Sequence, residues 1–294
     1  MSTEQNPGPS TTTVIQNAID EKSSSGGFVG LMKRQLQQSL AFGTLIILVI
    51  FFSIFGNNFF TWSNISGILL ATSVIGILAL GTTFVIITGG IDLSIGTGMT
   101  LAAVMTGVFI TNMGLPVWLG VLGGIGTGVL MGLVNGLNIT FLGLPPFIAT
   151  LAMMMIAQGL ALVISGVRPI YFSGSAPDFN QIALGTIVPG LPNAVLITLL
   201  LAVVGYLVLN RTILGRYTFA IGSNEEATRL SGVNTRRWKI LIYMFAGAFT
   251  GIAGVVLAGE VSLASAISSK IFSPSATAKP RRARSPPSTW PHRI

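Results

Sequence analysis

The chain has no cysteine and only one histidine among its 294 residues. The absence of cysteine excludes disulfides, thiolate catalysis and cysteine-ligated metal or iron–sulfur sites. The one histidine, His292, lies in an unusual C-terminal stretch, so a histidine-based triad or zinc site has no residues to use. We therefore expect no catalytic residue, no metal site and no cofactor.

Charge is scarce as well. Only 8% of the residues are charged, 51% are hydrophobic and the mean hydropathy is +0.77. A soluble domain carries about a quarter charged residues, so this chain has too little polar surface to cover a soluble core. Its apolar runs are long and do not alternate, which favours helices over a transmembrane β-barrel. The sequence predicts an all-α polytopic membrane protein.

Seven apolar runs are candidates for membrane-spanning helices. They cover residues 40–55, 67–87, 95–112, 117–138, 147–165, 194–210 and 240–264. Short linkers join the second to the fifth run, so we expect these helices to be neighbours in one bundle. The longer linker 166–193 is expected to hold a short surface helix at 179–187. Residues 1–37 are polar and rich in Ser, Thr, Gln and Gly, and are expected to be a disordered cytoplasmic leader.

Basic residues predict the orientation. Lys33 and Arg34 precede the first run and favour a cytoplasmic N-terminus. Six crossings later the chain reaches the segment 211–239, which holds six of the sixteen Lys and Arg residues. The even number of crossings and the positive charge therefore both place this segment in the cytoplasm. The formal charge of +8 is explained by such basic, lipid-flanking segments, and we expect no nucleic-acid partner.

The basic segment 211–239 contains the signals of a short helix at 225–231. These are a capping pair, two acids for the first turn, a basic residue and a glycine stop: Ser223, Asn224, Glu225, Glu226, Arg229 and Gly232. Glu225 and Arg229 are spaced for an i,i+4 ion pair. Two interpretations stay open, a solvated connection between spans or a helix that docks a cytoplasmic partner.

A few polar residues interrupt the apolar runs. Asp92 lies in the segment TGGIDLSIG (88–96), and its spacing favours capping of the third helix over a role in a substrate path. Asn135, Asn138 and Gln158 either join helices or line a path for a hydroxylated solute. The near absence of charge inside the bundle argues against a path for ions or protons.

The fourth run has a glycine at every fourth position: Gly120, Gly124, Gly128, Gly132 and Gly136. Such a stripe lets a neighbouring helix approach closely. The sequence leaves open whether that neighbour belongs to the same chain. Residues 266–294 are rich in Pro, Arg, Ser and Ala and contain no acid. We expect an aberrant, disordered tail, produced by a frameshift that truncates the membrane domain 38–265.

Three segments together resemble the permease subunits of bacterial ABC importers for simple sugars, the ribose/xylose-type family. They are ITGGIDLSIG at 87–96, NG at 135–136 and GRYTFAIGSNEEATRLSGVNTRRWKILIYMFAGAFTGIAGVV at 215–256. The likeness covers roughly residues 40–265. It implies alternating access in an inner-membrane dimer, with two separate ATP-hydrolysing subunits and a periplasmic or surface sugar-binding protein. The family continues with further spans where this chain has its tail.

In that family a G-x-N-x-x-A pattern and the residues after it lie in the cytoplasmic loop that contacts the ATPase subunit. The matching residues here are Gly222, Asn224, Glu225, Ala227, Arg229, Ser231 and Gly232. Two alternatives to a sugar permease stay open: a branched-chain amino-acid permease, and a stand-alone channel or secondary carrier. A membrane enzyme is disfavoured, because the apolar runs contain no paired acids, His or Cys.

Overall fold

A computed structural model describes residues 40, 42–56, 58–168, 170, 172, 176 and 178–272, the last eleven as backbone only. The chain forms two compact units, residues 1–65 and 66–294. The described part of the first unit includes an apolar helix, Phe42–Phe55. The expected leader 1–37 and residues 273–294 of the expected tail lie outside the described residues.

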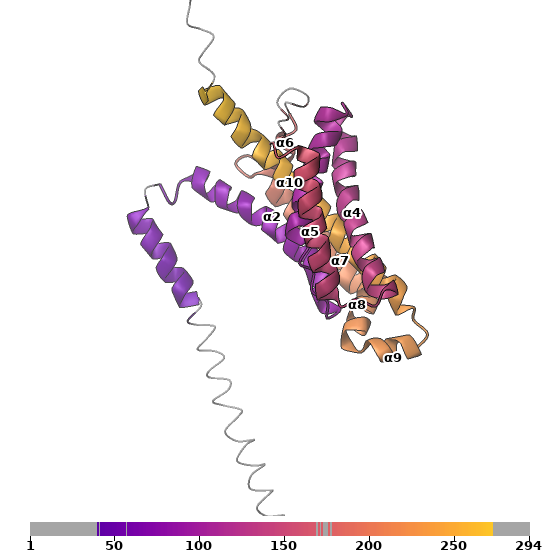
Figure 1. The fold of residues 1–294 in the computed structure, drawn as a ribbon. Helices are drawn as coiled ribbons and strands as arrows, with labels where there is room; N and C mark the ends of the chain where they lie inside the picture. The colour runs from indigo at the N-terminus through magenta and orange to yellow at the C-terminus, as the bar shows by residue number, and fades with distance from the viewer. Residues whose placement is uncertain are drawn as a thin grey trace, which may run out of the picture. The chain divides into compact units, whose positions relative to one another are not determined.

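Six helices are long and apolar enough to cross a membrane (Figure 1). Their elements are α2 (Trp62–Ile87), α3 (Ile95–Gly107) with the π-helical turn η1 (Val108–Asn112), α4 (Val117–Phe141), α5 (Pro146–Ser165), α7 (Asn193–Arg211) and α10 (Thr235–Phe272). Each coincides with a predicted run, and the described part of the chain contains no strand. The protein is therefore an all-α polytopic membrane protein. The helix at the first predicted run is shorter than these six, so a count of seven is not established.

Three short helices complete the described part of the chain: α6 (Gln181–Leu184), α8 (Ile213–Ser223) and α9 (Glu225–Leu230). α6 lies inside the predicted surface helix 179–187, and α9 matches the predicted helix 225–231. α8 was not predicted, because polar residues interrupt the apolar ones in its sequence ILGRYTFAIGS. α10 extends to Phe272, beyond the predicted end of the last run at residue 264.

Proline and glycine set the ends of several helices. Pro116 and Pro192 directly precede α4 and α7, and α5 begins at Pro146, where the fixed φ angle suits a first turn. Gly166 ends α5 with φ of 59°, a left-handed conformation that glycine adopts without steric cost.

The glycine stripe of α4 packs against helices of its own chain, which answers the question left open by the sequence. A Cβ atom on Gly128 would collide with the backbone of Gly247 and Gly251 in α10. One on Gly132 would collide with the carbonyl oxygen of Tyr243. Backbone therefore meets backbone along the α4–α10 interface, where van der Waals contact drives helix association in lipid.

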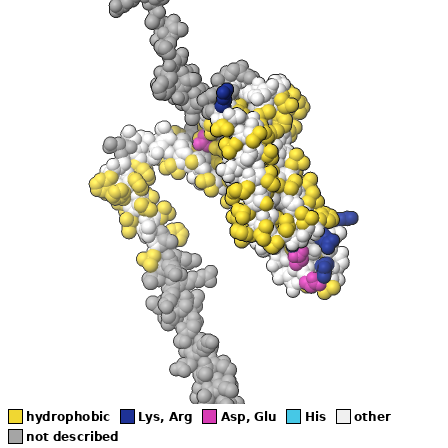
Figure 2. All heavy atoms as spheres, in the orientation of Figure 1, with side chains coloured by type: hydrophobic (Ala, Val, Ile, Leu, Met, Phe, Trp, Pro, Cys, Tyr) yellow, Lys and Arg dark blue, Asp and Glu magenta, His cyan; other side chains and the backbone are white. Residues whose placement is uncertain are grey.

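Hydrophobic side chains cover the helices along their length, and charged side chains gather at the α8–α9 end (Figure 2). α7 is the most exposed of the six span-length helices, with only Ala194 and Gly205 buried, whereas more than half of the apolar part of α10 is buried. α10 is thus the central helix of the described bundle, and it starts at the charged end.

Candidate functional site

Three local features hold helix α9 in place: a cap, a side-chain hydrogen bond and a glycine stop. The Asn224 side-chain oxygen accepts from the backbone amide of Ala227 at 2.9 Å, which confirms the predicted cap. The Thr228 hydroxyl donates to the carbonyl of Ala220 in α8 at 2.9 Å and so fixes α9 on α8. Gly232 ends α9 with φ of 85°, as predicted for a glycine stop, and Val233 donates to the carbonyl of Thr228.

The predicted ion pair between Glu225 and Arg229 is wrong. Arg229 pairs with Glu226 at 2.6 Å, three residues earlier, and Glu225 pairs with Lys239 of α10 at 2.5 Å. Spacing along a helix shows only which residues share a face, and α10 supplies a nearer cation for Glu225. The second pair joins the first turn of α9 to the first turns of α10.

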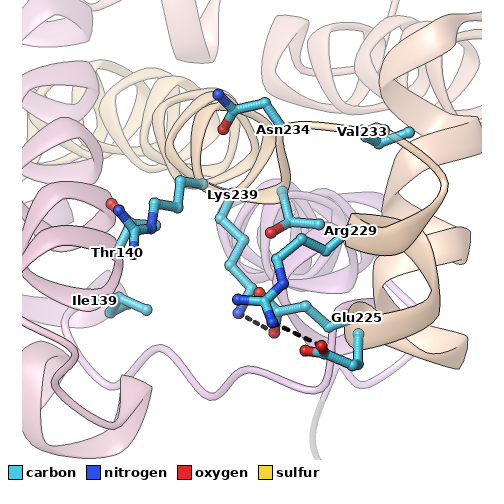
Figure 3. A pocket seen from close by; sticks show the side chains of 11 residues that line it. Ile139, Thr140, Glu225, Arg229, Val233, Asn234 and Lys239 are labelled. Atoms are coloured by element: carbon cyan, nitrogen blue, oxygen red, sulfur yellow. Dashed lines mark hydrogen bonds and ion pairs between the residues drawn. The ribbon is translucent and has the colours of Figure 1, made fainter.

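A cavity of about 610 Å³ lies between the end of α4 and the α9–α10 connection. Figure 3 shows Ile139 and Thr140 of α4 on one side and the ion pairs of α9 on the other. The remaining polar lining of this cavity includes Asn234, Thr235 and Arg236. A second hollow of about 300 Å³ lies on the other flank of α9, lined by residues of α8 and α9 such as Tyr217 and Ser231. The short helix thus stands between two open hollows.

Gly222 lies directly on the end of α2. A Cβ atom on Gly222 would collide with the carbonyl oxygen of Ile87, the last residue of α2. Gly89, with φ of 75°, then turns the chain out of α2. The turn region that contains α8 and α9 therefore contacts the start of the segment that carries Asp92.

The prediction that Asp92 caps the third helix is wrong. Its Oδ1 accepts from the backbone amide of Ser94 at 2.8 Å and from the Ser94 hydroxyl at 2.6 Å. Ser94 precedes α3, so the carboxylate closes the turn before the helix and binds none of the helical amides. Burial raises the pKa of the Asp92 carboxyl from its ordinary value of 3.8, and the two bonds from Ser94 partly offset this.

Asn135 completes a hydrogen-bonded chain with these two residues. Its side-chain Nδ2 donates to the Ser94 hydroxyl oxygen at 2.9 Å, which connects α4 to the 88–94 segment. On the other side, the amide of Leu93 donates to the Thr150 hydroxyl of α5 at 3.2 Å. Sequence reasoning missed Ser94 and Thr150, because a hydroxyl inside an apolar run does not show which distant residue it meets.

The four residues expected to line a path do not form one cluster. Asp92 and Asn135 meet through Ser94, Asn138 is half-buried one turn further along α4, and Gln158 is exposed on α5. The described residues contain no group of three or more His, Cys, Asp or Glu side chains that could hold a metal ion.

Residues 64–278 match the family model described as branched-chain amino acid transport system / permease component. The chain belongs to this permease family. It is thus a non-catalytic transport component and a multi-pass integral protein of the inner membrane. The match runs past residue 265, the predicted end of the membrane domain.

Three curated relatives of this chain are permeases named for sugars. The ribose import permease protein of Haemophilus influenzae is 34% identical over 233 residues, which cover 79% of this chain and 72% of the relative. The L-arabinose transport system permease protein of Escherichia coli is 38% identical, over 75% of this chain and 67% of the relative. The fructose import permease protein of Rhizobium meliloti is 36% identical, over 77% of this chain and 65% of the relative. No solved structure matches the chain significantly.

Proposed function

We propose that this chain is the transmembrane subunit of an ATP-binding-cassette importer that moves a monosaccharide by alternating access. The observation that carries the proposal is the similarity to permeases named for ribose, L-arabinose and fructose, at 34% to 38% identity. The described spans suit a neutral polar cargo, because their interior offers amides and hydroxyls such as Asn135 and Thr150 in place of paired charges.

A separate ATP-binding subunit supplies the energy. The sequence contains no G-x-x-x-x-G-K-[ST] pattern, so ATP hydrolysis belongs to a partner. We place the docking surface of that partner on α9 and the loop around it: Gly222, Asn224, Glu225, Ala227, Arg229, Ser231 and Gly232. A rigidly capped, exposed helix with a hollow on each flank suits insertion between surface elements of another protein. This end of the bundle and the N-terminus then face the cytoplasm.

The sugar path lies between this chain and a second permease subunit. Gln158 supports this placement, because its amide is exposed near the middle of the apolar helix α5. An amide left in contact with lipid tails is unfavourable, so a polar path or a partner helix explains its position better. Asp92, Asn135 and Asn138 lie where such a path reaches the α8–α9 end. A periplasmic or surface sugar-binding protein delivers the cargo to the opposite end.

Co-purification separates this function from a stand-alone channel or carrier. The full chain, tagged and expressed together with its ATP-binding subunit, is expected to retain that subunit through affinity purification in mild detergent. Arg229→Glu, which reverses a charge on the proposed docking helix, is expected to release it. Arg168→Glu, at the end of the bundle opposite α9, is the matched control. If both the wild type and the control fail to retain the ATP-binding subunit, the proposal is contradicted.

A further inference from the structure

Two buried polar atoms have no hydrogen-bond partner within the described part of the chain: Asn135 Oδ1 in α4 and the Tyr243 hydroxyl in α10. Their residues are 1% and 2% exposed. An unpaired polar group at such burial is costly and rare in folded proteins. The two atoms are complementary, since one is an acceptor and the other carries a donor hydrogen.

The orientation of the Asn135 amide follows from its neighbours. The Ser94 hydroxyl gives its hydrogen to the Asp92 carboxylate, so towards Asn135 the hydroxyl oxygen acts as acceptor. Asn135 must therefore present its NH₂ group to Ser94, which leaves Oδ1 as the unpaired atom. A flipped amide would not remove the difficulty, because it would set oxygen against oxygen.

Both residues contact the 88–94 segment. Asn135 binds Ser94, and the Tyr243 hydroxyl lies 2.6 Å from the position that a Cβ atom on Gly90 would occupy. The unpaired donor and the unpaired acceptor thus lie against the same segment, one at each side of the α4–α10 contact. That segment also touches Gly222 at its start, through Ile87 and Thr88.

The contact between α4 and α10 is made by backbone at two neighbouring turns. Gly132 and Gly136 of α4 face the backbone of Tyr243 and Ile240, so at these two positions no α4 side chain stands between the helices. Small sliding of packed helices is a common form of conformational change. The first turns of α10 are joined to α9 by the Lys239–Glu225 ion pair. A displacement of α9 therefore reaches Tyr243 along a single continuous helix.

We propose that Tyr243 is a positioning residue of the transport cycle. In a second conformation, reached by a slide of α10 along α4, the Tyr243 hydroxyl donates to Asn135 Oδ1. This bond holds α10 against α4 and, through Ser94, carries the movement of α9 into the 88–94 segment. In the conformation described here neither atom has a hydrogen-bond partner among the described residues. The inference rests on the proposed function, because it assigns the displacement of α9 to the ATP-binding subunit.

Tyr243→Phe tests the proposal, since it removes the hydroxyl and leaves the ring. The full chain is reconstituted with its ATP-binding subunit and sugar-binding protein, and ATP turnover and thermal unfolding are measured. We expect kcat of the stimulated complex to fall about 2- to 10-fold, the effect of one net hydrogen bond. The KM for ATP and co-purification should not change, and the unfolding midpoint should stay equal or rise. Tyr206→Phe, which removes a hydroxyl from a residue 64% exposed on α7, is the matched control.

A double variant tests the proposed Tyr243–Asn135 hydrogen bond independently. Adding Tyr243→Phe to Asn135→Ala should cause no further loss of stimulated turnover, because the partner oxygen is already gone. Unchanged kcat in Tyr243→Phe overturns the inference, and so does a lowered unfolding midpoint, which would show that the hydroxyl is already bonded. A wild-type complex that is not stimulated at all contradicts the proposed function instead, and the unfolding midpoints still decide the state of the hydroxyl.

Discussion

The backbone of Gly222 lies against the carbonyl oxygen of Ile87, so closely that a side chain at position 222 has no room. This contact joins the α8–α9 region to the end of α2 and to the segment that carries Asp92. Gly222 was expected to act on the ATP-binding subunit. Its position shows in addition that it is the point where the proposed docking region meets the bundle.

Gly222→Ala is expected to lower stability and transport together. The added methyl group must displace α8 from the end of α2, and overpacking of this kind costs about 1–3 kcal/mol. The thermal midpoint of the purified chain, followed by tryptophan fluorescence, measures the loss. Gly126→Ala in α4 is the matched control, because a Cβ atom there meets nothing within 4 Å and alanine favours a helix. Equal midpoints for the two variants would contradict the close contact.

Asp92→Asn is expected to remove a pH dependence of stability. Burial raises the pKa of the folded carboxyl above 3.8, so the folded chain holds this proton more tightly than the unfolded chain does. As pH rises from 3.8 through the folded value, the unfolded chain loses the proton first and the free energy of unfolding falls. Asparagine keeps an oxygen that accepts both bonds from Ser94 and carries no charge.

The variant should therefore be as stable as the wild type, or more so, at neutral pH. As pH rises above about 4, its unfolding midpoint should decline less than that of the wild type. Asp178→Asn, which removes an exposed carboxylate, is the control for the loss of one charge. A wild-type midpoint that instead increases over this range would show that the ionised carboxylate stabilises the fold.

Arg229→Ala separates docking from stability. The Arg229–Glu226 pair is exposed, with both side chains 63% accessible, and such pairs contribute about 0–1 kcal/mol. The unfolding midpoint should hardly change. ATP turnover coupled to transport should fall about tenfold, as expected when an interface contact of about 1.4 kcal/mol is lost. Turnover equal to that of the wild type would remove Arg229 from the docking surface.

The lack of cysteine makes orientation directly measurable, because a single introduced thiol is the only reactive one. Ser231→Cys, at the end of α9, is expected to react with a membrane-impermeant maleimide only after intact cells are opened. Thr186→Cys, exposed between α6 and α7, should react in intact cells. The reverse pattern would place the α8–α9 end outside and exclude a cytoplasmic ATP-binding partner there.

Local signals in the sequence predicted much of the fold. The long apolar runs predicted the six span-length helices, and the cap at Asn224 with the stop at Gly232 predicted α9 almost to the residue. α8 could not be separated from a loop, because Arg216 and Thr218 interrupt its apolar residues. Its amphipathic pattern, read at helical spacing, was the available signal.

Contacts between distant residues were beyond sequence reasoning. Asn135 and Ser94 are 41 positions apart, and no local pattern states that their side chains meet. The Glu225–Lys239 pair was missed for the same reason, since α10 returns to α9 only in the folded chain. The Tyr243 hydroxyl gave no signal either, because a single tyrosine in an apolar run is ordinary.

ATP-driven uptake into proteoliposomes tests the central claim most directly. Vesicles hold the full chain and its ATP-binding subunit with ATP on the cytoplasmic side, and sugar-binding protein on the other. Radiolabelled ribose, arabinose, fructose and leucine are offered separately. The account predicts uptake of at least one of these sugars that requires both ATP and the ATP-binding subunit, with no uptake of leucine. Uptake of leucine, or of a sugar without the ATP-binding subunit, would contradict it.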